Sequence, residues 1–371
     1  MTDAPAHIMI IGASGVFGSR LVQLMQKEPG WRVTLVGRRT APLERLAAGH
    51  DGYSVRALDR NLICADDLAG VDLVIDASGP FQNSHSAVID AAIDARCHYA
   101  DLADGRDFVG AIGRFDVRAK AANIAVITGA SSVPALSHAV LDHLTAGWRE
   151  VEAIQVGIYP GNRAPRGRAV VEAILSYSGK PVRVFRDGRW QQLPGWGMLH
   201  RADIAGVGKR WASICDTPDQ DLLVARYAPT KSAEFFAGLE LPILHLGLWG
   251  LSLPVRWGLI PSLRPAAGIM LWMAQRFLRF GSDKGAMEVV VSGTDAAGQR
   301  ARRRWTLAAD ANRGPFTPTL AALALARRLR DGRFDFRGAM PCAGMLSLAE
   351  FDRDFDALDM QRRIDSLPPA S

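Results

Sequence analysis

The first 130 residues alternate short apolar runs with segments whose apolar positions recur three and four residues apart. The short runs predict strands, and the three-and-four spacing predicts helices. The predicted strands are residues 7–11, 32–36, 53–57, 71–77, 98–100 and 124–128. The predicted helices are residues 16–26, 42–48, 84–95, 116–122 and 137–145. Repeated β-α units of this kind predict an α/β fold with a parallel, doubly wound sheet.

The pattern changes from about residue 151, where strands follow one another directly. We predict strands at 151–159, 182–193 as a hairpin, 221–227, 286–293 and 300–309. Helices are predicted at 168–177, 318–330 and 347–358. The sequence therefore predicts three parts. They are a Rossmann-type sheet at 1–150, an α+β domain built on a mixed or antiparallel sheet at 151–310, and C-terminal helices at 311–371 that pack back on the first domain.

An apolar insertion interrupts the second domain at 239–280, and its most apolar part is 241–279. A membrane-spanning helix needs roughly 20 uninterrupted apolar residues. Prolines and arginines, among them Pro254 and Arg256, interrupt this stretch, so we do not expect it to span a membrane. Three interpretations remain: helices packed in the core or at a dimer interface, a lid over an apolar substrate, or a basic amphipathic element on a membrane surface.

The composition of the chain limits which kinds of ligand and partner we expect. The chain has 371 residues, 48% apolar, with a net charge of +6, which suits an anionic ligand such as a phosphorylated cofactor. No basic stripe with interleaved aromatic residues occurs, so we expect no nucleic-acid partner. The N-terminus has no signal-peptide pattern, and we expect a cytoplasmic protein. No metal site or redox dithiol is expected, because no CxxC pair occurs among Cys64, Cys97, Cys215 and Cys342.

The stretch "IIGASGVFG" at 10–18 follows the first predicted strand and opens the first predicted helix. Gly12 would permit a tight turn, Gly15 a close approach of backbone to a pyrophosphate, and Gly18 close packing of helix on strand. Free amides at a helix N-terminus bind phosphate oxygens. We therefore predict a dinucleotide-binding loop made of Gly12, Ala13, Ser14, Gly15, Val16, Phe17 and Gly18.

The second predicted strand ends in "VGRRT", which places Arg38 and Arg39 after it. A domain that binds NAD has an Asp or Glu at this end to bond the ribose 2′-hydroxyl. A carboxylate would repel a 2′-phosphate, whereas a guanidinium pairs with one. The sequence thus predicts NADP (NADPH) and makes NAD the weaker expectation. The alternative is a pair of solvated surface arginines.

Small residues follow the most apolar predicted strand in "DASGPF". Ligands of doubly wound sheets bind outside the carboxyl ends of the strands. A turn of small residues would let the nicotinamide half of the cofactor lie against backbone, with a phenylalanine packing on a ring. The predicted cofactor contacts here are Ala77, Ser78, Gly79, Pro80 and Phe81.

Polar residues at the ends of the next two strands are candidates for chemistry. Tyr99 and Asp101 are two positions apart, so they share one face of an extended segment. Either could contact substrate or hold a proton, and Asp101 could equally cap the next turn. Ser132 follows the last strand and could bond a carbonyl oxygen. We predict Tyr99, Asp101 and Ser132 as catalytic groups, and His138 as a packed core histidine.

One apparent motif is rejected. "YAPTK" has the YxxxK spacing of short-chain dehydrogenases, whose chemistry needs Tyr and Lys one turn apart on a helix. Pro229 lies between Tyr227 and Lys231, and proline blocks an interior helical turn. The motif also follows a predicted strand and falls in the second domain, so we assign it no role.

With these residues, the chain resembles the saccharopine dehydrogenase-like oxidoreductases, including trans-acting enoyl reductase-like members. The resemblance is carried by the glycine motif, "DLVIDASGPF", "HYADLADG" and the closing "GPFTPTLAALALARRL". It is specific over 8–135 and looser over 180–285. The resemblance implies NAD(P)-dependent hydride transfer, either at a C–N bond of amino-acid conjugates or on lipid-derived substrates.

The apolar 241–279 region suits a greasy substrate better than a dicarboxylic amino acid. The sequence therefore predicts an NADPH-dependent reductase acting on a C=C, C=N or C=O bond of an apolar, lipid-derived small molecule. Alternatives are a saccharopine- or opine-type C–N oxidoreductase and a non-catalytic, membrane-associated nucleotide-binding scaffold. A homodimer and a peripheral contact of 241–279 with the inner membrane face are the further partners expected. Arginines for a dicarboxylate would come from Arg163, Arg166 and Arg168.

Overall fold

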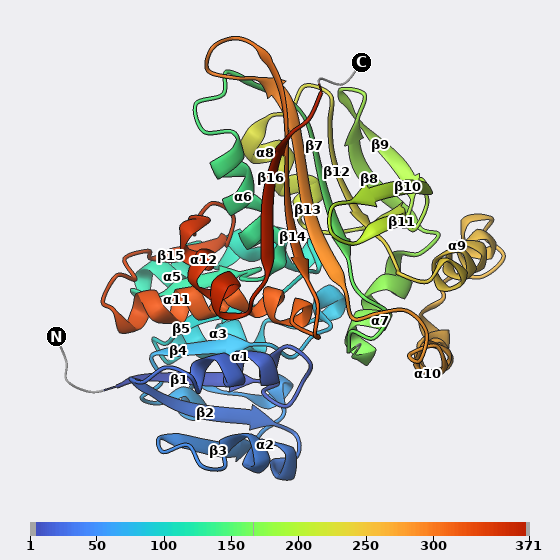
Figure 1. Cartoon of the computed structure of the whole chain (residues 1–371). Coiled ribbons are helices and arrows are strands. Elements are labelled where there is room, and N and C mark those ends of the chain that lie inside the picture. Colours follow the sequence, from blue (N-terminus) through green and yellow to red (C-terminus); the bar gives the residue numbers. More distant parts are fainter. Residues whose placement is uncertain (1–4, 166, 369–371) are drawn as a thin grey trace. The chain divides into compact units, whose positions relative to one another are not determined.

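The structure of the chain, a computed structural model, describes residues 5–165 and 167–368 (Figure 1). Contacts divide the chain into two compact units. The first contains the chain up to Leu136 together with Pro315–Leu346, and the second contains Ser137–Gly314 together with the chain from Ser347 onward. The boundary predicted at 311 lies close to the observed one, whereas the first boundary follows residue 136 and not 150, because the next helix packs on the second sheet. The last segment, from Ser347 onward, was predicted to pack on the first domain but belongs to the second unit.

The first unit is a parallel seven-stranded sheet in the order β15-β6-β5-β4-β1-β2-β3, which confirms the predicted doubly wound fold. All its strand pairs run parallel. Its strands are β1 (Ala6–Ile11), β2 (Trp31–Gly37), β3 (Tyr53–Ala57), β4 (Leu73–Asp76), β5 (His98–Asp101), β6 (Ala125–Thr128) and β15 (Gly338–Pro341). Its helices are α1 (Gly18–Met25), α2 (Thr40–Ala47), α3 (Ala87–Asp94), α4 (Arg106–Gly110), α5 (Asp116–Ala121) and α11 (Leu320–Arg330).

The core of the first unit follows from its apolar strands. Every residue of β4 and of β6 is buried, as expected for parallel strands covered on both faces. The C-terminal part of this unit is tied in by ion pairs. The Glu28 carboxylate, after α1, bonds Arg327 of α11 at 2.5 Å and Arg330 at 3.0 Å.

The second unit is a mixed nine-stranded sheet in the order β10-β11-β12-β7-β13-β14-β16, with β8 and β9 attached beside β12. Only β7 and β12 are parallel neighbours among its described strands. Its strands are β7 (Glu150–Tyr159), β8 (Pro181–Arg186), β9 (Arg189–Pro194), β10 (His200–Ile204), β11 (Gly208–Ile214), β12 (Ser232–Ala237), β13 (Gly285–Thr294), β14 (Arg300–Ala309) and β16 (Gln361–Ser366). Its helices are α6 (Ser137–Leu144), α7 (Arg168–Tyr177), α8 (Asp219–Tyr227), α9 (Pro242–Arg256), α10 (Ala267–Arg276) and α12 (Ala349–Ala357).

One predicted strand is wrong, because residues 221–227 belong to helix α8. Pro218 precedes the helix, Asp219 and Asp221 are acidic residues in its first turn, and Ala228 adopts the left-handed conformation that ends it. The helix thus ends at Tyr227, so Tyr227 and Lys231 do not share a helical turn. Lys231 instead pairs with Glu152 at 2.8 Å.

Candidate functional site

The glycine loop between β1 and α1 is held against the turn after β4. Gly12 has a φ of +74°, and a Cβ there would fall 2.8 Å from the Cβ of Ser78. The amide of Gly15 donates to the Gly12 carbonyl at 2.8 Å, and the space at Gly18 is closed by the same carbonyl. A Cβ at Gly12 or Gly18 would therefore displace the loop, which is the requirement predicted for these two positions.

The tip of the glycine loop is open to a ligand. Ser14 and Gly15 are exposed, and α1 begins at Gly18 with no acidic residue in its first turn. The amides of Val16 and Phe17 have no hydrogen-bond partner within the described chain. Unpaired amides before a helix are the usual donors to a pyrophosphate, so the loop fits that group.

Two arginines stand next to this loop. Arg38 and Arg39 follow β2, and both side chains are exposed. A Cβ at Gly37, the last residue of β2, would lie 3.7 Å from the Ser14 hydroxyl, which places the end of β2 beside the glycine loop. Neither arginine pairs with a carboxylate of residues 5–165 or 167–368. The pair therefore fits an anionic group that extends from the loop toward β2.

The turn after β4 is built on a buried carboxylate that the sequence analysis did not single out. Asp76 is fully buried, pairs with Arg60 at 2.5 Å, and accepts hydrogen bonds from the Ser78 amide at 2.9 Å and hydroxyl at 2.5 Å. A charged residue at the end of an otherwise apolar strand was the signal that could have identified it. This ion pair holds the backbone of residues 77–80 at the edge of the sheet.

The structure corrects the predicted role of Phe81. Its side chain is 3% exposed, packs against Phe108 with ring centroids 5.4 Å apart, and lies under the Arg60 guanidinium at 5.2 Å. Phe81 therefore anchors the turn from inside and does not present its ring to a ligand. The partly exposed positions of the turn are Ala77, Ser78, Gly79 and Pro80.

Tyr99 and Asp101 are both fully buried and hydrogen-bonded to each other at 2.9 Å. The other carboxylate oxygen of Asp101 accepts from the Thr128 hydroxyl and from the amides of Ala103 and Gly129, at 2.7 to 2.9 Å. These bonds join the turns after β5 and β6. The sequence left open whether these side chains contact substrate or hold a proton, or whether Asp101 caps the next turn. In the structure both side chains are fully buried, and Asp101 caps that turn by accepting from the Ala103 amide.

Burial shifts the protonation of this pair. It raises the pKa of Asp101 to about 6, although the amides of Gly129 and Ala103 act in the opposite direction. The pKa of the Tyr99 phenol lies well above its ordinary value because the group is desolvated and faces the Asp101 charge. Tyr99 is thus a neutral donor at physiological pH, and its bond to Asp101 is fixed.

Ser132, the third residue predicted as catalytic, follows strand β6 at the same edge of the sheet as Tyr99 and Asp101. It begins the turn Ser132–Leu136 after β6 and is 6% exposed, and neighbouring Ser131 is 7% exposed. Neither hydroxyl has a hydrogen-bond partner in the part of the chain that the structure describes. These hydroxyls are therefore available to a bound group, unlike the polar atoms of Tyr99 and Asp101.

Arg20 is a residue near the glycine loop that sequence reasoning missed. It lies on α1, donates to the Val16 carbonyl at 2.5 Å, and its guanidinium lies 5.5 Å from the ring centre of Phe316. Phe316 comes from the C-terminal part of the first unit, so this contact brings the returning segment next to the loop. Only its position in the first turn of the helix after the glycine motif could have pointed to it.

His138 is fully buried in the second unit, as predicted for a packed histidine. Its Nε2 lies 3.7 Å from a carboxylate oxygen of Asp219, which is also fully buried and is hydrogen-bonded by Ser137. Burial lowers the pKa of His138 to about 3 and raises the pKa of Asp219 to about 7. The pair is therefore a neutral histidine beside a carboxyl group that titrates near neutrality.

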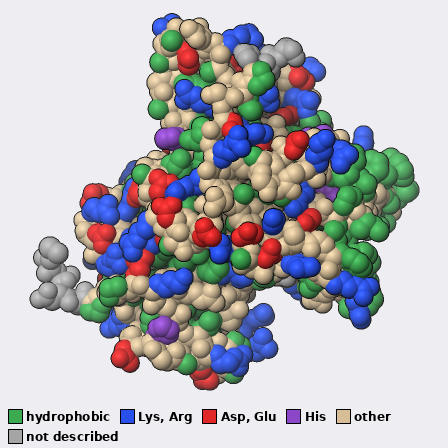
Figure 2. Space-filling view, viewed as in Figure 1, with side chains coloured by type: hydrophobic (Ala, Val, Ile, Leu, Met, Phe, Trp, Pro, Cys, Tyr) green, Lys and Arg blue, Asp and Glu red, His purple; other side chains and the backbone are tan. Residues whose placement is uncertain are grey.

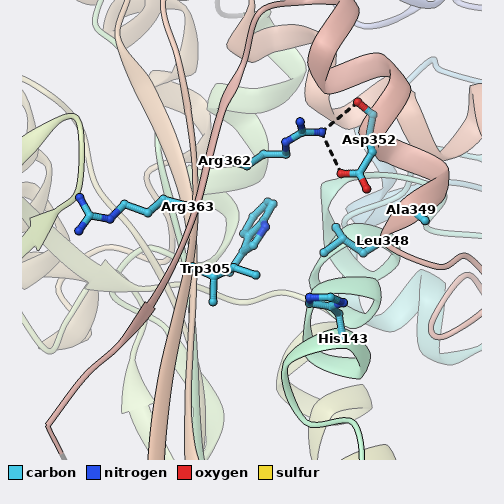
Figure 3. Close-up of a pocket in the computed structure, with 8 residues that line it drawn as sticks. His143, Trp305, Leu348, Ala349, Asp352, Arg362 and Arg363 are labelled. Carbon is cyan, nitrogen blue, oxygen red and sulfur yellow. Dashed lines mark hydrogen bonds and ion pairs between the residues drawn. The ribbon is translucent and has the colours of Figure 1, made fainter.

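A hollow in the second unit has a volume of about 420 Å³ (Figure 3). Arg362 points to Asp352 across it and bonds that carboxylate at 2.9 Å, and Arg363 pairs with Asp365 at 2.5 Å. Both arginines already have carboxylate partners, and we assign the hollow no chemistry. Within residues 5–165 and 167–368, no group of three or more His, Cys, Asp or Glu residues could hold a metal ion.

The comparisons with known proteins agree with the glycine loop. Residues 8–142 match the family model described as the saccharopine dehydrogenase NADP binding domain. Over these residues the chain is similar to the NADP-binding domain of saccharopine dehydrogenases. Its first domain is accordingly that of an NAD(P)-dependent oxidoreductase, which binds a nicotinamide cofactor. A search of curated protein sequences gives no match.

Comparison with two solved structures shows a shared fold for one of them. Apo saccharopine dehydrogenase (L-Glu forming) from Saccharomyces cerevisiae has a TM-score of 0.72 at 13% identity, over 98% of this chain and 100% of that one. The WlbA dehydrogenase from Chromobacterium violaceum, solved with NADH and UDP-GlcNAcA, has a TM-score of 0.45 at 11% identity, over 100% and 98% of the two chains. The first likeness shows a shared fold, and the second is too weak to bear on function.

Proposed function

We propose that the protein is an NADPH-dependent reductase that transfers hydride to a C=C, C=N or C=O bond of an apolar, lipid-derived substrate. The observation that carries the choice of NADPH is the exposed pair Arg38 and Arg39 beside the glycine loop. No Asp or Glu stands at this end of β2, where a carboxylate would serve the 2′-hydroxyl of NAD. Two guanidiniums there favour a 2′-phosphate.

Different elements of the first unit would bind different parts of such a cofactor. Amides of the glycine loop would bind the pyrophosphate, and the turn after β4 would support the nicotinamide half. Bound NADPH supplies the hydride, and the protein supplies orientation and polar contacts. Ser132 is our candidate for a polar contact near the reacting atom, because its hydroxyl is not used elsewhere in the described chain. Tyr99 and Asp101 would contribute indirectly, by holding the turns after β5 and β6 in position.

The class of substrate rests on the second unit. Residues 241–280 carry no carboxylate and are rich in leucine and tryptophan, which suits an alkyl chain better than a zwitterion. The alternative, a dicarboxylic amino-acid conjugate, would need converging arginines. Arg168 is paired with Glu172 at 2.6 Å, and Arg163 donates to the Arg279 carbonyl at 3.5 Å. Arg166, the third predicted member, lies outside the described residues. The apolar substrate is therefore favoured.

Cofactor titration tests the first half of this proposal. Binding of NADPH and NADH would be followed through the fluorescence of the reduced nicotinamide, for wild type and for the double variant Arg38→Ala with Arg39→Ala. We expect the wild type to prefer NADPH and the variant to bind NADPH roughly 10- to 100-fold more weakly, with NADH binding unchanged. Arg45→Ala, an exposed arginine on α2, is the matched control.

The second half needs turnover. NADPH oxidation would be measured with long-chain enoyl thioesters, imines and ketones, and with amino-acid–oxoacid pairs that form saccharopine-type conjugates. Turnover with a long-chain acceptor supports the proposal, and turnover confined to the amino-acid pairs would replace it with the C–N oxidoreductase. Tight NADPH binding with no oxidation on any acceptor would indicate a non-catalytic scaffold. Preference for NADH, or unchanged NADPH affinity in the double variant, would overturn the cofactor assignment.

A further inference from the structure

Exposed apolar side chains are concentrated in one segment of the second unit. Ten of the fourteen large apolar residues that are well exposed among the described residues lie between Ile243 and Phe280. Figure 2 shows them gathered over α9 and α10, at the right of the view. Leu259 is 71% exposed, Ile269 66% and Trp257 64%. We call the exposed apolar residues of 243–280 the apolar face. A contiguous face of this kind marks a binding surface.

Hydrogen bonds fix the two ends of the segment that carries the apolar face. The carboxylate of Glu240, just before α9, accepts hydrogen bonds from the amides of Asn162 at 2.6 Å and Ser282 at 2.8 Å. The side-chain amide of Asn162 donates to the carbonyls of Phe277 and Phe280, at 2.6 and 2.8 Å. These hydrogen bonds hold both ends of the segment at one place. The apolar side chains are therefore exposed on a folded element and not on a loose loop.

Helix α9 already has a buried side. This side packs on the second unit and consists of His245, Leu248, Ser252 and Val255. His245 bonds the Ser213 hydroxyl of β11 at 2.9 Å, which fixes the helix on the sheet. Ile243, 64% exposed, lies on the opposite side, and Leu251, 45% exposed, flanks the buried side. A helix that is apolar on both sides needs a second apolar environment besides the core on which it packs.

The charges of the segment are all of one sign. Residues 241–280 contain four arginines and no Asp or Glu. Arg256, Arg276 and Arg279 are exposed, and none has a carboxylate partner in the described parts of the chain. Arg276 lies 4.9 Å from the ring centre of Trp272, and Arg279 is equally close to Phe280. The cationic groups therefore accompany the apolar side chains that are exposed.

We propose that the apolar face docks on the anionic surface of a lipid bilayer and lies in its interface. Leucine and tryptophan side chains would enter the boundary of the acyl chains, while the arginines reach lipid phosphates with their apolar stems buried. Neither helix crosses the bilayer, since α9 has 15 residues and α10 has 10. No helix among the described residues is long and apolar enough to do so.

The same observations disfavour a second copy of the chain as the occupant. A two-fold interface pairs a surface with itself, so the arginines of both copies would face one another. No carboxylate within 241–280 could separate them. Like charges facing each other across an interface weaken association, whereas anionic lipid neutralises them.

Vesicle flotation tests the docking. The full chain would be mixed with vesicles of phosphatidylcholine alone, or with roughly one third phosphatidylglycerol, at low and high salt. We expect flotation with the anionic vesicles that falls as salt rises. Ile269→Ser with Trp272→Ser should lower vesicle affinity at least tenfold, and Arg276→Gln with Arg279→Gln roughly 30-fold on anionic vesicles only. All variants should bind NADPH as wild type does, which separates this proposal from the proposed reaction.

Matched variants make the result specific. Leu62→Ser with Val117→Ser removes two apolar side chains that are each 80% exposed but lie in the first unit, and should leave flotation unchanged. Arg45→Gln with Arg189→Gln is the equivalent control for charge. Absence of flotation, or flotation that is equal in the face variants and the controls, would overturn the proposal. A concentration-dependent dimer that Ile269→Ser with Trp272→Ser abolishes, without vesicle binding, would show instead that a second copy covers the face.

Discussion

Gly12 and Ser78 approach so closely that a Cβ on the glycine would fall 2.8 Å from the Cβ of the serine. The two residues follow neighbouring parallel strands, β1 and β4. Their contact therefore joins the glycine loop to the turn after β4, the two elements that we assign to the two halves of the cofactor. The positive φ of Gly12, +74°, is the conformation that lets its backbone approach in this way.

Gly12→Ala should consequently impair both folding and cofactor binding. A left-handed conformation costs a non-glycine residue roughly 1–2 kcal/mol, and the added methyl group must also push the Ser78 turn away. We expect a lower thermal midpoint and at least tenfold weaker NADPH binding. Thermal unfolding with and without NADPH measures both effects. Gly110→Ala is the control, because a Cβ there meets nothing within 4 Å, and a similar loss in that variant would contradict the explanation.

The sequence located the loops of the sheet edge but not the orientation of their side chains. Strand order and the glycine pattern follow from apolar periodicity, and the structure confirms the parallel sheet. Alternation along a strand placed Tyr99 and Asp101 on one face, yet both faces of a parallel strand are covered, so a shared face did not mean a ligand-facing one. For Phe81, the deciding contacts with Phe108 and Arg60 are tertiary and have no local signature.

In the second unit, local signals were present for α8 and absent for β16. Pro218 and the acidic residue Asp219 mark a helix start, but the β-branched and apolar run "LLV" outweighed them in the prediction. Strand β16 is rich in arginine and mostly exposed. Its position is set by hydrogen bonding to β14 from Arg303↔Ser366 to Ala308↔Gln361, which only the folded sheet provides.

Replacing Asp101 separates a positioning role from a catalytic one. Asn can accept the three hydrogen bonds that converge on one Asp101 oxygen and can donate to the Tyr99 hydroxyl, so Asp101→Asn should fold and bind NADPH. Asp101→Ala leaves buried donors unpaired and should destabilise the protein by about 3 kcal/mol or more. Thermal unfolding, NADPH titration and turnover would be measured for both. If Asp101→Asn is stable and binds NADPH but loses all turnover, Asp101 takes part in the chemistry directly.

Asp219 makes stability depend on pH in a defined direction. Burial raises its pKa from 3.8 to about 7, so the folded protein holds a proton that the unfolded chain has released. The stability that this proton contributes is present at low pH and is lost as pH rises through about 7. Asp219→Asn keeps a neutral group there, and should be more stable than wild type by about 1–3 kcal/mol at pH 8.

The difference should shrink as pH falls toward 5, which thermal midpoints over this range would show. His138 has the opposite effect on stability. Its pKa is lowered from 6.5 to about 3 in the folded protein, so stability falls as pH drops below 6.5, where only the unfolded chain protonates this histidine. This effect is common to wild type and Asp219→Asn and cancels in the comparison. Asp187→Asn, at an exposed turn in the same unit, is the control. A pH-independent difference for Asp219→Asn would contradict the assignment.

The ion pairs of Glu28 should make the C-terminal segment a stabilising part of the first unit. The Glu28 and Arg327 side chains are 8% and 11% exposed, and Arg330 bonds the same carboxylate. Glu28→Ala removes a shared partner and leaves two cationic groups close together in a poorly solvated place. Breaking a buried pair in this way costs about 3–5 kcal/mol.

The exposed pair of Arg118 with Asp90, in the same unit, is the reference. Arg118→Ala should cost about 1 kcal/mol or less. Limited proteolysis and thermal unfolding would compare the two variants. Cleavage near residue 330 in Glu28→Ala but not in Arg118→Ala is the expected outcome, since α11 is then the element released, and equal resistance in both would show that the apolar contacts of α11 suffice.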